Sequence, residues 1–135
     1  MTQSERRIYL ISELIKDNKR CDNLLIPYAA AEQKTLLRAL FNVRPSKKAG
    51  NRFLKIQDEY LTEEIKQKGI IDIDSLSPVK PDIYLWQGDI ITLRCDAIVN
   101  AANCRMLGCF YPNHSCIDNA IIPMQELNCG LPATT

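Results

Sequence analysis

Three side chains that could bind a metal ion lie close together near the end of the chain. Cys109, His114 and Cys116 form the pattern C-x4-H-x-C. Two thiolates and an imidazole are ligands that zinc prefers, and three protein ligands leave a fourth position open for water or substrate. The spacing therefore favours an open zinc site. Cys104 could supply a fourth ligand, which would make the site structural.

The same pattern has a simpler interpretation. The two cysteines could be ordinary buried thiols, with His114 exposed on a loop. His114 is the only histidine of the chain, and it lies between two cysteines. Its position favours the metal interpretation, because imidazole and thiolate are here brought together in one short loop.

Two loops upstream carry polar side chains that could bind a ligand. Gly88-Asp89-Ile90 follows a β-prone run, and by itself it is typical of a plain turn. Asn100 and Asn103 flank two alanines after the next β-prone run. Carboxamides placed there can hydrogen-bond sugar hydroxyls, while the small residues let a ligand approach the backbone. Asparagine is also a common turn former, so the binding hypothesis needs both loops together.

Asp118 and Asn119 follow the cysteine and histidine pattern, where a helix is expected to start. Either side chain could cap that helix at its N-terminus. The functional alternative is an acid that faces a metal ion or a sugar ring.

The elements that position these loops are predicted from hydrophobic periodicity. Residues 83–86 and 97–99 are short β-prone runs followed by polar loops, which is typical of buried strands that lead into a site. Ligands of open α/β sheets bind just past such strand ends. The predicted fold class is therefore α/β.

Three helices are predicted before these strands. Ser4 could cap the first, which ends at Asp17-Asn18. A second fits residues 29–43 and is stopped by Pro45, and a third fits residues 53–68 with Gly69 as its stop. The chain thus begins with a helical portion, residues 1–80, and continues into the opening strands of an α/β layer.

Composition and charge exclude several function classes. The net charge is +1, but residues 1–80 hold 15 Lys and Arg against 11 Asp and Glu, whereas residues 81–135 hold 2 against 5. A nucleic-acid site would concentrate basic residues around the loops, so we expect no nucleic-acid partner. There is no apolar run long enough to span a membrane and no visible secretory signal. We therefore expect a cytoplasmic protein whose six cysteines are metal ligands or free thiols.

Three segments together resemble a known family. QGDI at 87–90, DAIVNAAN at 96–103 and LGCFYPNHSCIDNAI at 107–121 are similar to motifs of the macrodomain family, specifically its zinc-containing microbial branch. The resemblance covers the chain to about Ile121. It implies a mixed sheet between helices that binds ADP-ribose, preceded by a helical extension. It also implies hydrolysis of ADP-ribose from modified proteins. The alternatives are ADP-ribose binding without turnover and an inactive truncated product, because a chain that ends here is expected to lack most of the family's pyrophosphate-binding loops.

The resemblance assigns expected roles to individual residues. Asp89 would accept a hydrogen bond from the adenine amino group, with Ile90 at the adjoining backbone contact. Asn103 would hold the distal ribose and take part in catalysis. Ile117, Asp118 and Asn119 would line the distal ribose, with Asp118 as the catalytic acid. Cys109, His114 and Cys116 would bind Zn²⁺, and the partner would be ADP-ribose or an ADP-ribosylated protein, such as a lipoyl-carrier-type protein.

The last fourteen residues, IPMQELNCGLPATT, do not resemble the family. Pro123 falls where the helix after the zinc loop should be in its second turn. Back-translation after a one-base correction permits a helix-forming segment in place of this tail. We therefore predict three regions: a helical extension (1–80), an N-terminal part of a macrodomain that is incomplete at the C-terminus (81–121), and a frameshifted tail (122–135).

Overall fold

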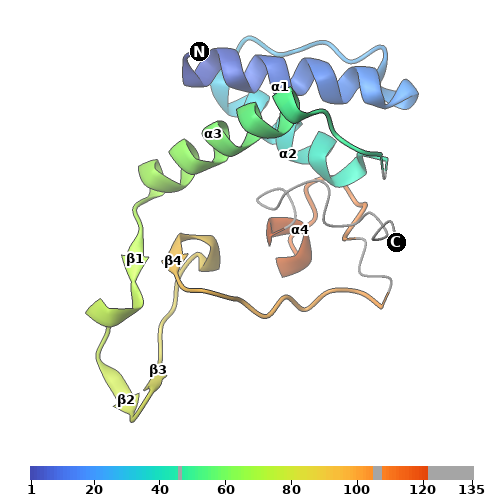
Figure 1. Cartoon of the computed structure of the whole chain (residues 1–135). Helices are drawn as coiled ribbons and strands as arrows, with labels where there is room; N and C mark the ends of the chain where they lie inside the picture. The colour runs from blue at the N-terminus through green and yellow to red at the C-terminus, as the bar shows by residue number, and fades with distance from the viewer. Residues whose placement is uncertain (46, 105–107, 122–135) are drawn as a thin grey trace.

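The computed structural model describes residues 1–45, 47–104 and 108–121. A layer of three α-helices is followed by short strands, 3₁₀ turns and one short helix (Figure 1). The α-helices are α1 (Gln3–Asp17), α2 (Ala30–Val43), α3 (Asn51–Lys68) and α4 (Ile117–Ile121). The strands are β1 (Ile71–Asp72), β2 (Pro78–Lys80), β3 (Ile83–Tyr84) and β4 (Leu93–Arg94), and the 3₁₀ turns are η1 (Lys19–Cys21), η2 (Ile73–Ser75) and η3 (Ile90–Thr92). The predicted order, a helical portion and then the strands of an α/β fold, is confirmed.

Helix α1 begins earlier than predicted. Thr2, and not Ser4, is its N-cap: the Thr2 hydroxyl accepts from the backbone N–H of Glu5, and the Glu5 carboxylate accepts from the backbone N–H of Thr2. This reciprocal pair satisfies two backbone donors that the first turn leaves without helical partners. The T-x-x-E spacing was present in the sequence and is a better cap signal than Ser4 alone.

The ends of the other long helices follow the predicted stop signals. Helix α2 ends at Val43, two residues before Pro45. Helix α3 ends at Lys68, and its C-cap Gly69 has φ +89° and donates its N–H to the carbonyl of Lys66. Glycine reaches this left-handed conformation without steric cost, so it can end the helix and turn the chain towards β1.

The apolar core lies where α1 packs against α2 and α3. Leu10 and Ile11 are fully buried, and Leu14 is almost so. They belong to one cluster with the inward faces of α2 and α3, which supply Leu37, Leu40, Phe41, Phe53, Ile56, Tyr60 and Leu61. Burying one such side chain contributes about 1.5–3 kcal/mol, so this cluster is the main stabilising element of the described chain.

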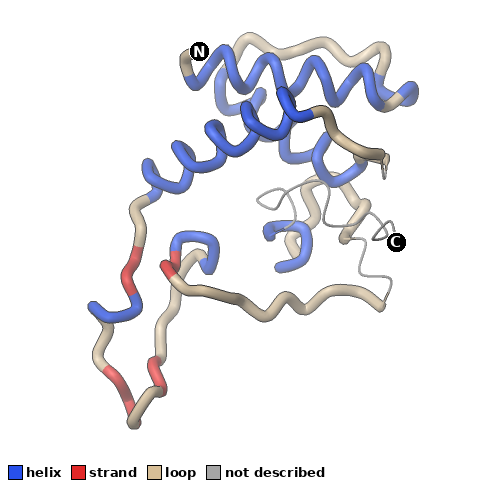
Figure 2. Tube along the Cα trace, in the orientation of Figure 1, coloured by secondary structure: helices blue, strands red, loops and turns tan. Residues whose placement is uncertain are grey.

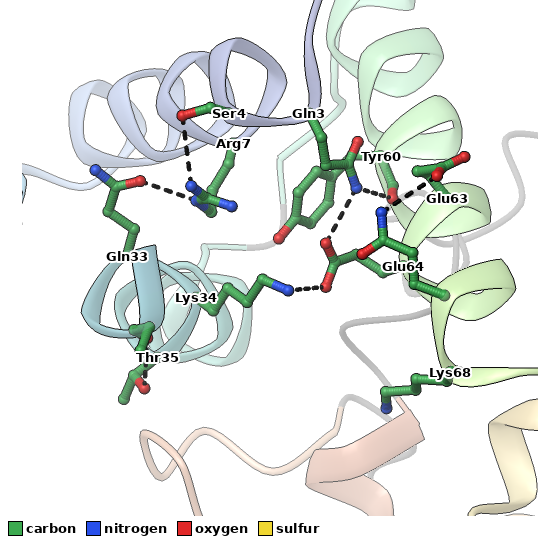
Figure 3. Close-up of polar contacts among 12 residues, drawn as sticks. Gln3, Ser4, Arg7, Gln33, Lys34, Thr35, Tyr60, Glu63, Glu64 and Lys68 are labelled. Atoms are coloured by element: carbon green, nitrogen blue, oxygen red, sulfur yellow. Dashed lines mark hydrogen bonds and ion pairs between the residues drawn. The ribbon is translucent and has the colours of Figure 1, made fainter. Parts of the chain in front are cut away.

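Polar contacts join the three long helices to one another (Figure 3). The Glu64 carboxylate accepts from Lys34 Nζ at 2.6 Å and from Gln3 Nε2 at 3.1 Å. Burial would raise the pKa of Glu64, but the bonds from Lys34 and Gln3 and the charges of Lys34 and Arg7 outweigh it and lower that pKa. Burial and the Glu64 charge raise the pKa of Tyr60 to about 12.

The β portion is smaller than predicted. Strands β1 and β4 pair in parallel, and β2 and β3 form an antiparallel hairpin. Figure 1 shows this hairpin at the opposite end of the molecule from the three-helix layer. Residues 83–86 contain β3, but the strand is exposed and not buried as expected, with Ile83 54% exposed.

The predicted strand at 97–99 is wrong. These residues lie in the irregular segment between β4 and α4, and Val99 is 93% exposed (Figure 2). A strand depends on a neighbour that takes up its backbone hydrogen bonds. No other strand pairs with this segment within the part of the chain that the structure describes.

Two further expectations are not decided by the fold. The predicted boundary near residue 80 stays a prediction, and the tail at 122–135 lies outside the described residues. Among the described residues, no helix is both long and apolar enough to span a membrane.

The Glu64 contacts predict a pH-dependent stability. Because the folded pKa of Glu64 lies below its ordinary value, its contribution is complete above about pH 4.3 and is lost as the pH falls through the folded pKa. We expect Glu64→Gln to lower the free energy of unfolding by about 1 kcal/mol at neutral pH. Urea unfolding at a series of pH values should show this difference shrink in acid.

Glu59→Gln is the matched control, since Glu59 pairs with Arg6 at 3.0 Å on the exposed surface. Glu59→Gln should lower the free energy of unfolding by about 0.5 kcal/mol or less. Equal losses for the two variants, or a Glu64 effect that persists at low pH, would contradict the assignment.

Candidate metal centre

A tight turn brings the histidine back towards the cysteines. The backbone N–H of His114 donates to the carbonyl of Tyr111 at 3.2 Å. Pro112 and Asn113 are the two central residues of this turn, and Asn113 has φ +54°. Proline followed by a residue with positive φ is the pattern of a type II turn, and asparagine tolerates that conformation better than most residues. The sequence F-Y-P-N-H therefore has a local reason to fold back.

The turn gathers the three predicted metal ligands. The ligand atoms of Cys109, His114 and Cys116 all lie within 4.8 Å of one another. In a tetrahedral zinc site such atoms are about 3.5–3.8 Å apart, since Zn–S and Zn–N bonds are about 2.3 and 2.0–2.1 Å. A small contraction of the loop would therefore let the three residues hold one ion. His114 is exposed and both thiols are half-buried, so a fourth position faces solvent.

The loop also favours the thiolate form of Cys109. The backbone N–H of Tyr111, the Cys116 thiol and the Asn119 amide donate towards its sulfur and lower the pKa of Cys109, with the Tyr111 contribution largest. Desolvation and the negative charge of Asp118 act in the opposite direction. A thiolate is the form that binds metal ions, so the loop is already polarised for that role.

Cys104 does not join this cluster. Its side chain is exposed, and the group of potential metal ligands found among the described residues contains only Cys109, His114 and Cys116. The three-ligand arrangement, and not a closed four-ligand site, is the one that the geometry supports.

Asn119 is the internal brace of the loop. Its side chain is fully buried, and Asn119 Nδ2 donates to the carbonyl of Tyr111 at 2.8 Å and to that of Cys109 at 3.5 Å. Its Oδ1 accepts from Arg38 Nη2 of helix α2 at 3.1 Å. The carboxamide thus uses both its donor and its acceptor inside the protein.

Asp118 lies beside the cluster and is 5% exposed. Its Oδ1 accepts from Asn100 Nδ2 at 2.8 Å, which links the loop after residue 99 to helix α4. Because α4 begins at Ile117, Asp118 and Asn119 lie within the helix, and the N-terminal capping alternative is wrong for both. Ile117 itself is 42% exposed.

Asn103 is exposed and braces the other side of the loop, where its Nδ2 donates to the carbonyl of Gly108 at 2.8 Å. Gly108 has φ +87°, a conformation in which other residues are strained. Asn100 and Asn103 therefore both contact the cluster region, through Asp118 and Gly108 respectively. The two predicted asparagines and the cysteine loop form one connected unit.

Asp89 has the turn geometry that was its simpler interpretation. Its Oδ1 accepts from the backbone N–H of Ile91 at 3.3 Å and caps η3, to which Ile90 belongs. Its Oδ2 accepts from Lys68 Nζ at 2.8 Å. The residue before Asp89 is Gly88, where a Cβ would collide with the Trp86 ring.

A pocket of about 250 Å³ lies between the helical layer and the loops. Asp89 and Ile91 line it from η3 and its cap, and Ala120 lines it from α4. Helices α2 and α3 supply the remaining wall, which includes Arg38 and Lys68. The turn at Asp89 and helix α4, which follows the metal loop, therefore border one common hollow.

Sequence reasoning missed Arg38 and Lys68. Arg38 contacts the metal loop, and Lys68 pairs with Asp89. Neither has a local sequence signal, because both contacts depend on how helices pack against loops distant in sequence. Arg94 makes an exposed ion pair with Asp72.

Comparison with known proteins found clear relatives. The chain is 52% identical over 125 residues to a protein-ADP-ribose hydrolase of Treponema medium, covering 90% of this chain and 48% of that protein. It is 43% identical over 114 residues to a protein-ADP-ribose hydrolase of Staphylococcus aureus (strain COL), covering 84% of this chain and 42% of that protein. A probable bifunctional ADP-ribose hydrolase/ADP-ribosyltransferase of Fusarium oxysporum f. sp. cubense is 41% identical over 102 residues, covering 67% of this chain and 17% of that protein.

The chain spans about half the length of the first two relatives. No protein-family model matches it.

Proposed function

We propose that this chain, which belongs to the family of protein-ADP-ribose hydrolases, supplies the metal-binding and ADP-ribose-binding loops of a zinc-dependent hydrolase that removes ADP-ribose from modified proteins. The observation that carries the proposal is the cluster of Cys109, His114 and Cys116 within 4.8 Å. A buried carboxylate, Asp118, lies beside this cluster.

Zinc is the metal that suits these ligands. Two thiolates and one imidazole are a soft donor set, and the solvent-facing fourth position is typical of a catalytic site rather than of a structural one. When bound, Zn²⁺ would polarise a ribose hydroxyl or a water molecule. A reducing, cytoplasmic location would keep both thiols available.

The ligand would extend from Asp89, which lines the pocket, towards the metal loop beyond the pocket. Asp89 would accept from the adenine amino group beside the backbone of Ile90, at the η3 end. Asn103 and the stretch 117–119 would hold the distal ribose at the metal end, where Asn103 already contacts the loop. The substrate class is therefore a protein that carries ADP-ribose on a side chain, and a lipoyl-carrier-type protein is one candidate.

Asp118 is the residue best placed to move a proton. It is nearly buried, and Asn100 Nδ2 donates to its Oδ1, which holds the carboxylate in a fixed position. A general acid or base needs such a fixed position more than it needs exposure. The chain's own residues thus bind and orient the substrate, and Asp118 exchanges a proton with it.

The metal proposal predicts about one zinc ion per chain. Cys116→Ser should abolish binding, because a neutral hydroxyl is a poor substitute for a thiolate. Elemental analysis after purification under reducing, zinc-replete conditions measures this. Cys95→Ser is the matched control, since Cys95 is exposed and outside the cluster, and it should keep the metal. A metal-free wild-type chain would refute the proposal.

The hydrolase proposal is tested by release of ADP-ribose from an ADP-ribosylated protein. Asp118→Asn keeps the side-chain shape and should lower the rate about 10²–10⁴-fold. Asp89→Ala should weaken ADP-ribose binding about 10–100-fold, the scale of a charged hydrogen bond. Calorimetry and a release assay with the zinc-loaded chain measure the two effects separately.

Asp96→Ala is the control for both measurements, because Asp96 is an exposed carboxylate outside the pocket lining. Tight ADP-ribose binding without any release would show a binding module instead of an enzyme. Release that is insensitive to both Asp118→Asn and Cys116→Ser would overturn the proposed mechanism.

A further inference from the structure

Arg38 connects the helical layer directly to the metal loop. It lies on α2, 76 positions before His114 in the sequence. Its Nη2 donates to the main-chain carbonyl of His114 at 3.2 Å and to Asn119 Oδ1 at 3.1 Å. Because the contact with His114 goes through the backbone, the imidazole stays free to bind a metal ion.

Asn119 links Arg38 to the rest of the loop through hydrogen bonds. While its Oδ1 accepts from Arg38, its Nδ2 donates to the carbonyls of Tyr111 and Cys109. Arg38 and Asn119 together therefore hold three loop carbonyls, those of residues 109, 111 and 114, from the inner side. The side chains of Cys109 and His114 are left to converge on a common point.

The guanidinium is held in a confined position. Arg38 is half-buried, and its Nε is enclosed without a hydrogen-bond partner in the described part of the chain. Taking a charged group partly out of water is unfavourable unless strong bonds offset it. Charge-assisted bonds to a carbonyl and a carboxamide are of that kind, so loop and helix are expected to order each other.

We propose that Arg38 is a positioning residue, which holds the loop of Cys109, His114 and Cys116 in its metal-binding shape. The helical layer is then part of the active site and not only an extension in front of it. This inference rests on the proposed zinc site. Groups that orient metal ligands from outside typically alter metal affinity, which separates this role from simple docking of α4 onto α2.

Arg38→Gln in the whole chain is the direct test. Glutamine lacks the charge and the forked donor group, so we expect the zinc dissociation constant, measured by competition with a chromophoric chelator, to rise about 10–100-fold. The absorption bands of the Co²⁺-loaded variant should shift away from those of a tetrahedral site. Arg38→Lys keeps the charge on a flexible stem and should show a smaller rise.

Arg6→Gln is the matched control. Arg6 is a cation of the same helical layer, but it pairs with Glu59 of α3 instead of with the metal loop. Its zinc dissociation constant should stay within about twofold of that of the wild type, because it removes an exposed ion pair only. Helical circular dichroism should be the same for all variants. If Arg38→Gln loses this signal, the zinc dissociation constant of Arg38→Lys is the test of the proposal.

The proposal is overturned if Arg38→Gln is folded and binds zinc as tightly as Arg6→Gln does. If Arg38→Gln is not folded, the proposal is overturned by an Arg38→Lys variant that binds zinc as tightly as the wild type. Amide hydrogen exchange of residues 109–114 in the metal-free chain is an independent readout, and it should be faster in Arg38→Gln than in Arg6→Gln. A wild-type chain that binds no zinc would refute the proposed function. The exchange comparison would then still decide whether Arg38 orders the loop.

Discussion

The rest of the described chain depends on the apolar packing of α1 against α2 and α3. It contains the large apolar cluster around Leu10 and Ile11, whereas the strands pair over only two or three residues each. Such short ladders are not stable alone. Polar contacts hold the loops to the helical layer, from Arg38 to Asn119 of α4 and from Lys68 to Asp89. Stability is therefore concentrated in the helices, and chemistry in the loops that they hold.

The helices could be predicted from sequence because their signals are local. The apolar period fixed their faces, and Pro45 and Gly69 marked where two of them end. The strand at 97–99 could not be judged in the same way. Alternating or continuous apolar residues show only that a segment could be a strand, and its backbone still needs a neighbouring strand. Val99, almost fully exposed, shows the consequence within the described structure.

In the site, too, the features that depend on local sequence could be predicted, and those that depend on long-range contacts could not. The C-x4-H-x-C spacing and the Pro112-Asn113 turn are local, so the convergence of the three ligands could be predicted from the sequence. The contacts of Asn100 with Asp118 and of Arg38 with Asn119 join segments 18 and 81 positions apart. No spacing rule reaches that far. Asn119 had two interpretations from sequence, and the buried carboxamide shows a third role, that of an internal brace.

The ion pair at Asp89 raises the question of whether this carboxylate is available to a ligand. Its side chain is 48% exposed and that of Lys68 is 44% exposed. Exposed pairs contribute about 0–1 kcal/mol, whereas a hydrogen bond to a charged group contributes about 1.5–3 kcal/mol. Each carboxylate oxygen also has two lone pairs, so an amino group could share Oδ2 with Lys68 or displace it. The pair therefore holds Asp89 in place without closing its carboxylate to another hydrogen-bond donor.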